Sequence, residues 1–382
     1  MTPARSARLL IVVSADYGEL SNALALTAGT RLDAALLLPD KLLAANRDGL
    51  PAAAARLASP DDVIDAVDRR RPDLVCLFSG YLYAANGLFA LEGLGALLGE
   101  LRNRRIPVAT TDPFLGLMHG GGPSPFSPRH PARAWLEAHF GAVARLLEPV
   151  PHVYPAPPDP APRLRWGSFF NPAILLADAG RRSCAERAAV LVGGETDRPR
   201  WLFVLAQEDY GAQAARMGRA PFEALLIERL RDAAAAGRQP VLIAPGGCVD
   251  ALIATGRTPA GAAMLPFCSQ SQFHALLMSA EQVFYWNFFT NSAPARLVNR
   301  LPVSFFDVGH MAHAMPPLLE LGLRSYYPGA RLAPLDQRRP LVAGELAARA
   351  ADQDAALAAA RERFRAQPAP EAMVDALLQP GP

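Results

Sequence analysis

The chain is poor in cysteine and lacks the cysteine motifs of disulfide-rich and redox-active proteins. Its 382 residues include four cysteines, and no two of them form a Cys-x-x-Cys pair. They are Cys76, Cys184, Cys248 and Cys268. Such scarce and scattered cysteines exclude a disulfide framework and favour a cytoplasmic protein.

Long apolar runs and basic stripes are also missing. No apolar run reaches the roughly 18–20 residues that span a bilayer, so no transmembrane segment is expected. The apolar run that follows Arg8 is short, and it suits a first core strand better than a signal peptide. The formal net charge is +2, and Arg69, Arg70 and Arg71 adjoin only where an expected helix ends and where they favour its dipole. We therefore expect no nucleic-acid partner.

The composition supports large hydrophobic cores. Hydrophobic residues make up 51% of the sequence and charged residues 19%, as in folded proteins with substantial interiors. A chain of 382 residues usually forms two domains. We place the first domain at residues 1–180, the second at 181–335, and a C-terminal helical segment at 336–382.

Apolar runs alternate with helical patterns through both halves of the chain. In the first half, strands are expected at residues 9–13, 34–38, 74–78 and 106–110, and helices at 21–28, 61–70, 91–104 and 132–147. In the second half, strands are expected at residues 201–206, 241–244, 263–267, 283–286 and 302–306, and helices at 221–236, 272–280, 316–323 and 339–367. This alternation predicts an α/β fold with two Rossmann-like domains facing a cleft, and a C-terminal helix that crosses between them.

The most informative segment is a polar turn between two buried strands of the second half. Its polar residues are Asn287, Thr290, Asn291 and Ser292. Asn, Ser and Thr favour helix starts because their side chains bind free backbone N–H groups, and Pro294 has a preset φ that suits a first helical turn. An exposed helix N-terminus at the carboxyl edge of a parallel sheet is a natural anion site. The turn therefore predicts a phosphorylated ligand, although its residues also fit simple helix caps.

Two other segments of the second half carry candidate binding residues. Gly246 and Gly247 follow a strand, where they form either a plain turn or a place for close backbone approach to a ligand. Asp307 and His310 follow the last strand and are candidates for hydrogen bonds to a sugar or within the protein. His310 and His313 lie three residues apart, but no third ligand is near them in the sequence, so no metal site is predicted.

Residues 265–310 resemble the donor-binding region of GT-B glycosyltransferases, especially the UDP-glycosyltransferase and MurG-like types. In that family a glutamine precedes a short helix, followed by a strand, a turn with Asn-Ser, and a strand that starts at proline. Gln270, Asn291-Ser292 and Pro302 occur here in this order. The chain departs from the pattern at Asn287 and Ala295, where the family has a diphosphate-binding His and a ribose-binding Glu.

The resemblance implies a glycosyltransferase that moves a sugar from a nucleotide-diphosphate donor, bound in the second domain, to a small-molecule or glycan acceptor. It implies no cofactor besides this donor, and the sequence carries no signal for an oligomeric state. Inversion is favoured because no Glu-x7-Glu pattern with a cationic pair is found. A nucleotide-sugar epimerase of the same fold is one alternative. A non-catalytic GT-B-like helper protein, consistent with Asn287 and Ala295, is another.

In enzymes of this layout the catalytic base often comes from the N-terminal half. Asp16 and Glu19 follow the first expected strand, and a carboxylate there is able to take the proton of an acceptor hydroxyl. Asp16 is the first candidate and Glu19 the second. Both also suit the start of the following helix, where acidic residues favour the dipole.

Polar and aromatic residues in the loops of the first half are candidates for acceptor binding. They are Tyr17, Tyr81, Tyr83, Asp112 and His119. Tyrosines present flat amphipathic faces to a ligand but are more often packed in cores, and Asp before Pro often forms a turn. His119 opens a His-Gly-Gly-Gly run that is typical of esterase oxyanion loops. The chain has no Gly-x-Ser-x-Gly elbow, so a hydrolase is excluded and a glycine-hinged lid is favoured.

Overall fold

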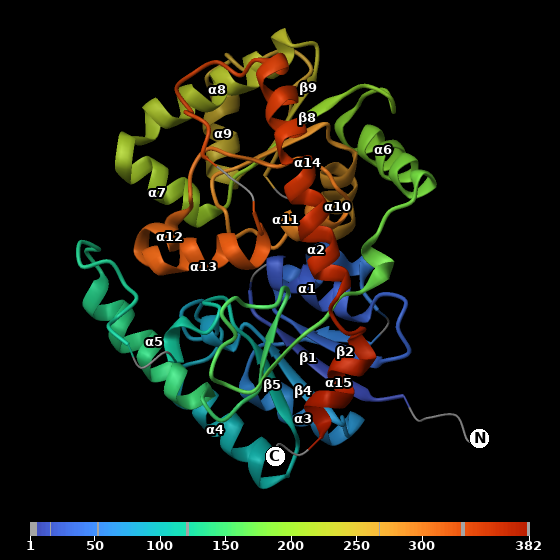
Figure 1. Ribbon diagram of the computed structural model, residues 1–382, viewed down its shortest axis with the longest axis vertical. Coiled ribbons are helices and arrows are strands. Elements are labelled where there is room, and N and C mark those ends of the chain that lie inside the picture. The colour runs from blue at the N-terminus through green and yellow to red at the C-terminus, as the bar shows by residue number, and fades with distance from the viewer. Residues whose placement is uncertain are drawn as a thin grey trace. The chain divides into compact units, whose positions relative to one another are not determined.

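The structure is a computed structural model that describes residues 6–15, 17–51, 53–119, 122–266, 268–329 and 333–379. The chain forms two compact units (Figure 1). Unit 1 comprises Met1–Ile174, Ala314–Tyr326 and Glu362–Pro382, and unit 2 comprises Leu175–His313 and Tyr327–Arg361. Whether residues 1–180 and 181–335 fold as separate domains stays a prediction.

Unit 1 contains a seven-stranded sheet in the order β3-β2-β1-β4-β5-β6-β7, and every recorded pairing in it is parallel. Its strands are β1 (Arg8–Val13), β2 (Asp33–Leu38), β3 (Ala54–Arg56), β4 (Leu74–Phe78), β5 (Val108–Thr111), β6 (His152–Tyr154) and β7 (Trp166–Ser168). Its helices include α1 (Tyr17–Thr27), α2 (Asp40–Asn46), α3 (Pro60–Arg70), α4 (Leu91–Asn103), α5 (Arg133–Leu147), α13 (Pro316–Tyr326) and α15 (Pro370–Leu378).

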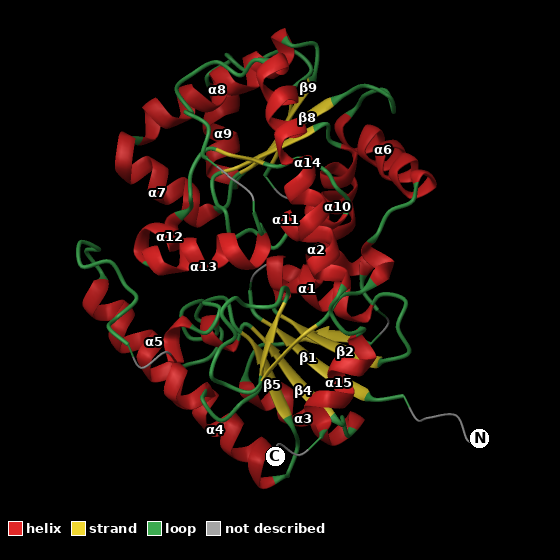
Figure 2. Cartoon of the chain, in the orientation of Figure 1, coloured by secondary structure: helices red, strands yellow, loops and turns green. Residues whose placement is uncertain are grey.

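Unit 2 contains a five-stranded parallel sheet in the order β10-β9-β8-β11-β12. Its strands are β8 (Arg200–Val204), β9 (Gln239–Ile243), β10 (Ala263–Leu265), β11 (Gln282–Tyr285) and β12 (Ser304–Phe305). Its helices include α6 (Asp178–Val192), α7 (Gln207–Met217), α8 (Arg219–Ala235), α9 (Gly246–Ala254), α10 (Gln270–Ser279), α11 (Ala293–Val298) and α12 (His310–Ala314). Figure 2 shows the strands of each sheet lying among helices. The long helix α14 (Ala343–Arg365) begins in unit 2, and its last turn belongs to unit 1.

The central strands are continuous apolar runs because both faces of each sheet are covered. In β1, Ile11 pairs with Leu36 of β2 and with Cys76 of β4. Ile11 packs with α1 and α15 in one core, and its neighbours Leu10 and Val12 on the opposite face are also fully buried. A strand buried on both faces must be apolar at every position, which confirms the expected parallel sheet.

Strand order reverses at one place in each sheet. In unit 1 the second and third strands lie on one side of β1, and β4 begins the other side. In unit 2 the same reversal separates β8 from β11. The loops at the carboxyl ends of the two strands leave in opposite directions at such a switch point, and this opens a crevice that binds ligands in α/β proteins.

Most expected strands and helices are confirmed, with shifts of a few residues at their ends. The elements that the sequence analysis missed include α2, β3, β6, α6, α7, α9 and α12. The proline-dense run at residues 149–162 contains β6, and residue 180 lies inside α6. Among the described residues, no helix is both long enough and apolar enough to cross a bilayer.

The C-terminal helix α15 completes the core of unit 1. Met373, Val374 and Leu377 are buried against β1 and β7, and Arg165 Nη2 donates to the last carbonyls of the helix. Met373→Ala is therefore expected to lower the free energy of unfolding by about 2–5 kcal/mol, because it leaves a cavity in this core. Urea unfolding followed by circular dichroism measures the change. The exposed Asp375→Ala in the same helix is the control, and equal stability of the two variants would contradict the assignment.

Candidate functional site

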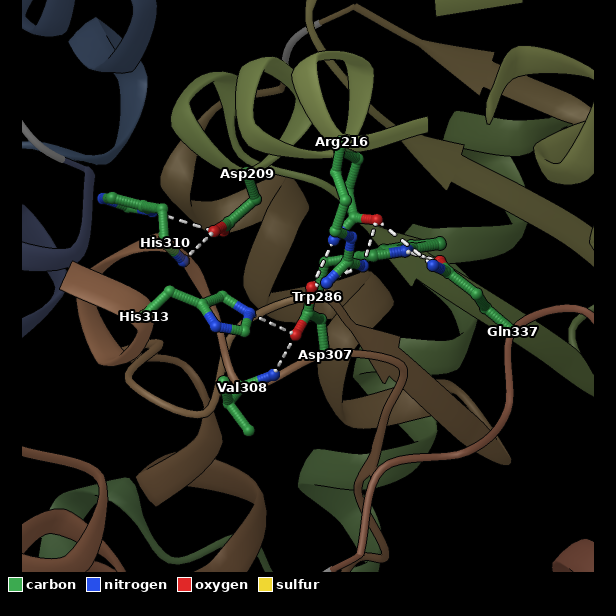
Figure 3. A network of polar contacts seen from close by, with 9 residues as sticks. Asp209, Arg216, Trp286, Asp307, Val308, His310, His313 and Gln337 are labelled. Carbon is green, nitrogen blue, oxygen red and sulfur yellow. Dashed lines mark hydrogen bonds and ion pairs between the residues drawn. The ribbon is translucent and has the colours of Figure 1, made fainter. Parts of the chain in front are cut away.

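Helix α7 brings the side chains of Asp209, Gln213 and Arg216 to the switch point of unit 2. It follows β8 directly, and its buried residues are Asp209, Tyr210 and Gln213. Arg216 lies about one helical turn after Gln213, and its guanidinium forms an ion pair with Asp307 (Figure 3). Because all strands of the sheet are parallel, α7 begins at the edge where β11 and β12 end.

Asp307 is the centre of this polar network (Figure 3). It follows β12 and is buried, and both of its carboxylate oxygens accept hydrogen bonds. Oδ1 accepts from the Val308 amide at 2.7 Å and contacts His313 Nε2 at 2.8 Å. Oδ2 accepts from Gln213 Nε2 and forms an ion pair with Arg216 Nη2 at 2.8 Å. Asp307 thus joins α7 to α12. This residue, which the sequence analysis predicted to contact the nucleotide-sugar donor, already has four partners within the protein.

His310 and Asp209 form a second carboxylate–imidazole pair, besides that of Asp307 and His313. Asp209 Oδ1 lies 2.8 Å from His310 Nδ1 and 3.1 Å from the His310 backbone nitrogen. Asp209 is buried, whereas the His310 side chain is 30% exposed. A buried carboxylate that holds one ring nitrogen fixes the orientation of the imidazole. His310 is thereby presented at the carboxyl edge of the sheet.

Two glutamines extend the network to the end of β11. Trp286 Nε1 donates to Gln337 Oε1 at 2.9 Å, and Gln337 Nε2 donates to Gln213 Oε1 at 3.2 Å. Gln213 Oε1 also accepts from Arg216 Nη2 at 2.7 Å. The oxygen and the NH₂ group of each buried glutamine therefore both have hydrogen-bond partners. A buried polar network destabilises the protein unless its groups are satisfied in this way.

The turn after β11 has a different local geometry from the one that we expected. Pro294 stands in the first turn of α11 as predicted, but the Ser292 side chain makes no capping bond. Its hydroxyl donates to Tyr285 Oη at 3.0 Å and lies 2.7 Å from Thr290 Oγ1. Ser292 is therefore the N-cap residue of α11 by position, as predicted, but its side chain does not cap the helix because contacts with Tyr285 and Thr290 engage its hydroxyl.

Asn287, which stands where the family has a cationic His, is held by its own turn. Its Oδ1 accepts from the Phe289 amide at 2.8 Å. Gly309 packs against it at φ +94°, and an added Cβ at Gly309 would overlap the Asn287 side chain. The glycine therefore permits the close approach of the two strand-end loops, from β11 and from β12.

The remaining predicted donor residues lie at the starts of two other helices of unit 2. Gly246 and Gly247 form the first turn of α9, and Gly247 O accepts from Arg219 Nη2 at 3.2 Å. Gly246 and Gly247 therefore begin a helix and do not form a plain turn. Gln270 is the first residue of α10 and follows the N-cap Ser269, which forms a capping box with Gln272. Binding roles for these residues stay predictions.

In unit 1, Glu19 is buried in a polar cluster near the switch point. Thr111 Oγ1 donates to Glu19 Oε2 at 3.0 Å and accepts from the Ser79 amide at 2.5 Å. Ser79 has φ +57°, a strained value for a residue with a side chain, and such values often occur at functional sites. Asp16, the first candidate base, lies outside the described residues. A catalytic role for Glu19 or Asp16 stays a prediction.

Of the tyrosines predicted to bind the acceptor, Tyr83 is fully buried and Tyr17 is partly buried. Tyr83 is fully buried and donates through its hydroxyl to Val12 O at 2.7 Å, so it joins β1 to the segment after β4. Burial raises the pKa of Tyr83 well above its ordinary value. Tyr17 begins α1 and is partly buried against the core of unit 1.

Tyr81, His119 and Asp112 do come together, along with two residues that the sequence analysis missed. Tyr81 Oη contacts Nε2 of His119 and lies 2.7 Å from Nε2 of His152. Asp112 accepts from the amides of Phe114 and Gly116 at 2.8 Å each, and from Tyr154 Oη at 3.2 Å. We refer to Tyr81, Asp112, His119, His152 and Tyr154 as the imidazole cluster.

Burial controls the charges of the imidazole cluster. Burial lowers the pKa of His152 to about 4, and burial together with His152 lowers the pKa of His119. The carboxylates of Asp112 and Glu148 oppose the second shift. Burial also raises the pKa of Asp112, against the effect of its backbone hydrogen bonds. Both imidazoles are therefore neutral near pH 7, with a carboxyl group close to His119.

No group of three or more His, Cys, Asp or Glu side chains is placed to hold a metal ion in the part of the chain that the structure describes. The two carboxylate–imidazole pairs of unit 2 each join one Asp with one His, which is fewer ligands than metal sites use.

Comparison with solved structures identifies the fold. The spinosyn rhamnosyltransferase SpnG is similar over 97% of this chain and 99% of its own, with 14% identity and a TM-score of 0.53. The same enzyme complexed with thymidine diphosphate gives 14% identity, a TM-score of 0.51, and coverage of 97% and 100%. The UDP-GlcNAc 2-epimerase of Methanocaldococcus jannaschii, in complex with UDP-GlcNAc and UDP, gives 9% identity, a TM-score of 0.50, and coverage of 94% and 98%. The chain has the GT-B fold.

No protein-family model matches the chain, and no curated protein matches it in sequence. The fold is therefore recognised through structure, and the activity has to be argued from the residues of the site.

Proposed function

We propose that this chain is a glycosyltransferase that binds a nucleotide-diphosphate sugar in unit 2 and transfers the sugar to a small-molecule or glycan acceptor. The observation that carries the proposal is the convergence of polar segments at the switch point of unit 2. They follow β8, β11 and β12, and they are joined through Asp307 and Gln213. In open parallel sheets this is the place where nucleotides bind.

The fold supports a nucleotide-sugar substrate. The similar rhamnosyltransferase has been solved with thymidine diphosphate, and the similar epimerase with UDP-GlcNAc and UDP. The residues from Thr290 to Ser292 precede α11 and are the expected contacts of the diphosphate. Backbone amides there would stabilise the negative charge that develops on the leaving group. Gly246, Gly247, Gln270, Asn287 and His310 remain the other proposed donor contacts.

Direct binding tests the proposal. Isothermal titration calorimetry with thymidine diphosphate and with UDP is expected to detect one site per chain. Asn291→Asp is expected to weaken that binding about 10-fold or more, because two like charges roughly 4 Å apart repel by about 1–4 kcal/mol. Asn103→Asp is the matched control, since it makes the same change at an exposed position of unit 1. Equal affinities of the two variants would move the diphosphate site away from the turn, and absence of binding would contradict the proposal.

An epimerase is the second candidate, because the UDP-GlcNAc 2-epimerase has the same fold over 94% of this chain. The two reactions differ in their products. A transferase releases a nucleoside diphosphate and a glycoside, whereas an epimerase returns a C2-epimerised nucleotide sugar. Proton NMR of nucleotide sugars incubated with the chain distinguishes them. Binding without any turnover would instead favour a helper protein, in keeping with Asn287 at the position of the family's cationic His.

A further inference from the structure

We infer that a nucleotide bound in unit 2 draws a proton onto His310, and that the imidazolium formed there supplies the positive charge that balances the diphosphate. This inference rests on the proposed function and concerns unit 2 alone. It makes His310 a cation that is charged when the ligand binds, which is more than a donor contact, and it couples nucleotide binding to pH.

The segments that follow the strands of unit 2 are poor in positive charge. The five residues after each of β8, β9, β10, β11 and β12 include no lysine and no arginine. His310, the fifth residue after β12, is the one residue among them whose side chain takes up a positive charge near neutral pH. Because ligands of parallel sheets bind at these carboxyl ends, a diphosphate there depends on His310 for a cation.

Two arginines of the neighbouring helices are engaged within the protein. Arg296 of α11 is fully buried, and its guanidinium donates to backbone carbonyls at the end of α10 and before β12. Arg216 of α7 forms an ion pair with Asp307 and donates to Gln213. The charge of Arg216 is therefore already balanced by a buried carboxylate, and that of Arg296 is held away from the sheet edge.

Asp209 determines which ring nitrogen of His310 takes up the proton. The Asp209 carboxylate only accepts hydrogen bonds, so His310 Nδ1, which lies 2.8 Å from Asp209 Oδ1, carries a hydrogen (Figure 3). The second proton of an imidazolium therefore belongs to Nε2. The His310 amide donates to the same oxygen at 3.1 Å, and Asp209 is buried, so both the backbone and the ring of His310 are held in place.

His310 adjoins the turn after β11 that we propose binds the diphosphate. The Phe288 amide donates to Val308 O at 3.3 Å, and Gly309 packs against the Asn287 side chain. The loops after β11 and β12 are therefore in contact immediately before His310. Since the turn itself is uncharged, a cation on the adjoining loop is well placed to balance the charge of a diphosphate held there.

The charges around His310 explain why a proton is taken up when the ligand binds. The charged and titratable groups of the described network are Asp209 and Arg216 of α7, Asp307 after β12, and His313 of α12. With both imidazoles neutral, two carboxylates face one guanidinium, and a diphosphate adds further negative charge. A proton on His310 opposes this accumulation, so the proton and the diphosphate each favour the binding of the other.

Calorimetry in buffers of different ionisation enthalpy measures the proton uptake. Thymidine diphosphate and UDP are titrated near pH 7 into the full chain in PIPES and in Tris, and the dependence of the observed enthalpy on the buffer gives the number of protons exchanged. Wild type is expected to take up about one proton more per nucleotide than His310→Lys, whose ammonium is charged beforehand. Titration of the nucleotide's own phosphate is common to both proteins and cancels in the difference.

Two substitutions separate the charge of His310 from its hydrogen bond. Glutamine and lysine both keep a donor for Asp209, but only lysine keeps a positive charge. His310→Gln is expected to weaken nucleotide binding about 10–100-fold, because a charge-assisted hydrogen bond to phosphate is lost. His310→Lys is expected to stay within about 3-fold of wild type. His130→Gln, the same change as the first in unit 1, is the control.

The outcomes distinguish this inference from the proposed function. Wild-type affinity in His310→Gln, or equal proton uptake in wild type and His310→Lys, would overturn the inference. Equally weak binding by both His310 variants would also overturn it, since the loss would then follow from the shape of the side chain and not from its charge. A wild-type chain that binds neither nucleotide would overturn the proposed function itself.

Discussion

Asp307→Asn is expected to lower the stability of unit 2 and to weaken nucleotide binding together. The Asp307 carboxylate accepts from Gln213, Arg216 and the Val308 amide, and contacts His313 Nε2. An amide at this position has one oxygen and one NH₂ group, so the NH₂ group must face a donor. Arg216 would also lose its partner in a region where Asp307 is buried.

Removing one partner of a buried ion pair typically costs about 3–5 kcal/mol, and we expect the lower part of this range because Arg216 is half exposed. Urea unfolding measures the loss. Calorimetry with thymidine diphosphate or UDP is expected to show affinity reduced about 10-fold or more, because α7 and α12 are no longer held at the switch point.

Asp250→Asn is the control for both measurements, since Asp250 is an exposed aspartate on α9 of the same unit. If Asp307→Asn matched this control in stability and in nucleotide affinity, the network in Figure 3 would not be what holds α7 and α12 in place.

Arg296→Met is expected to have the largest effect on stability. Arg296 is fully buried, and its guanidinium donates to Pro302 O at 3.0 and 2.8 Å, to Leu277 O at 2.6 Å, and to Ala280 O at 3.0 Å. Two of these carbonyls belong to the last turn of α10 and the residue after it, where helices leave carbonyls without partners. Arg296 therefore ties α11 to the end of α10 and to the segment that leads into β12.

Burial lowers the pKa of Arg296 to about 10, so the side chain is still charged at neutral pH. Methionine fills most of the space but leaves several buried carbonyls unsatisfied, at about 1–3 kcal/mol each. We expect a loss of at least ~3 kcal/mol in the free energy of unfolding. Thermal and urea unfolding measure it.

The control for Arg296→Met is Arg339→Met, an exposed arginine of the same unit. Because α11 follows the turn that we propose binds the diphosphate, nucleotide affinity is expected to fall as well in the Arg296 variant. A variant as stable as the control would show that other groups satisfy these carbonyls.

The sheets were largely predictable because strands buried on both faces have a simple sequence pattern. Residues 9–13 and 74–78 are apolar at every position, and the structure places them in the centre of the first sheet. Helix α7 was not predictable in this way. Its buried residues are Asp209, Tyr210 and Gln213, so it has no apolar stripe from which a helical period can be read.

The candidate site was predictable in part, as single residues. Asp307 and His310 were recognised from their position after a strand, but Asp209 and Arg216 become visible as their partners only when β8 lies beside β11. His152 was missed because β6 has three residues and lies within a proline-dense run. A histidine next to two apolar residues there was the one available signal. Pairings between distant segments depend on strand order, which local pattern does not specify.

A crystal structure of the chain with thymidine diphosphate or UDP bound tests the central claim most directly. The account predicts that the diphosphate lies at the carboxyl edge of the unit 2 sheet, against the backbone of Thr290 to Ser292. Crystals that contain the nucleotide elsewhere, with that turn closed by its own side chains, would contradict it.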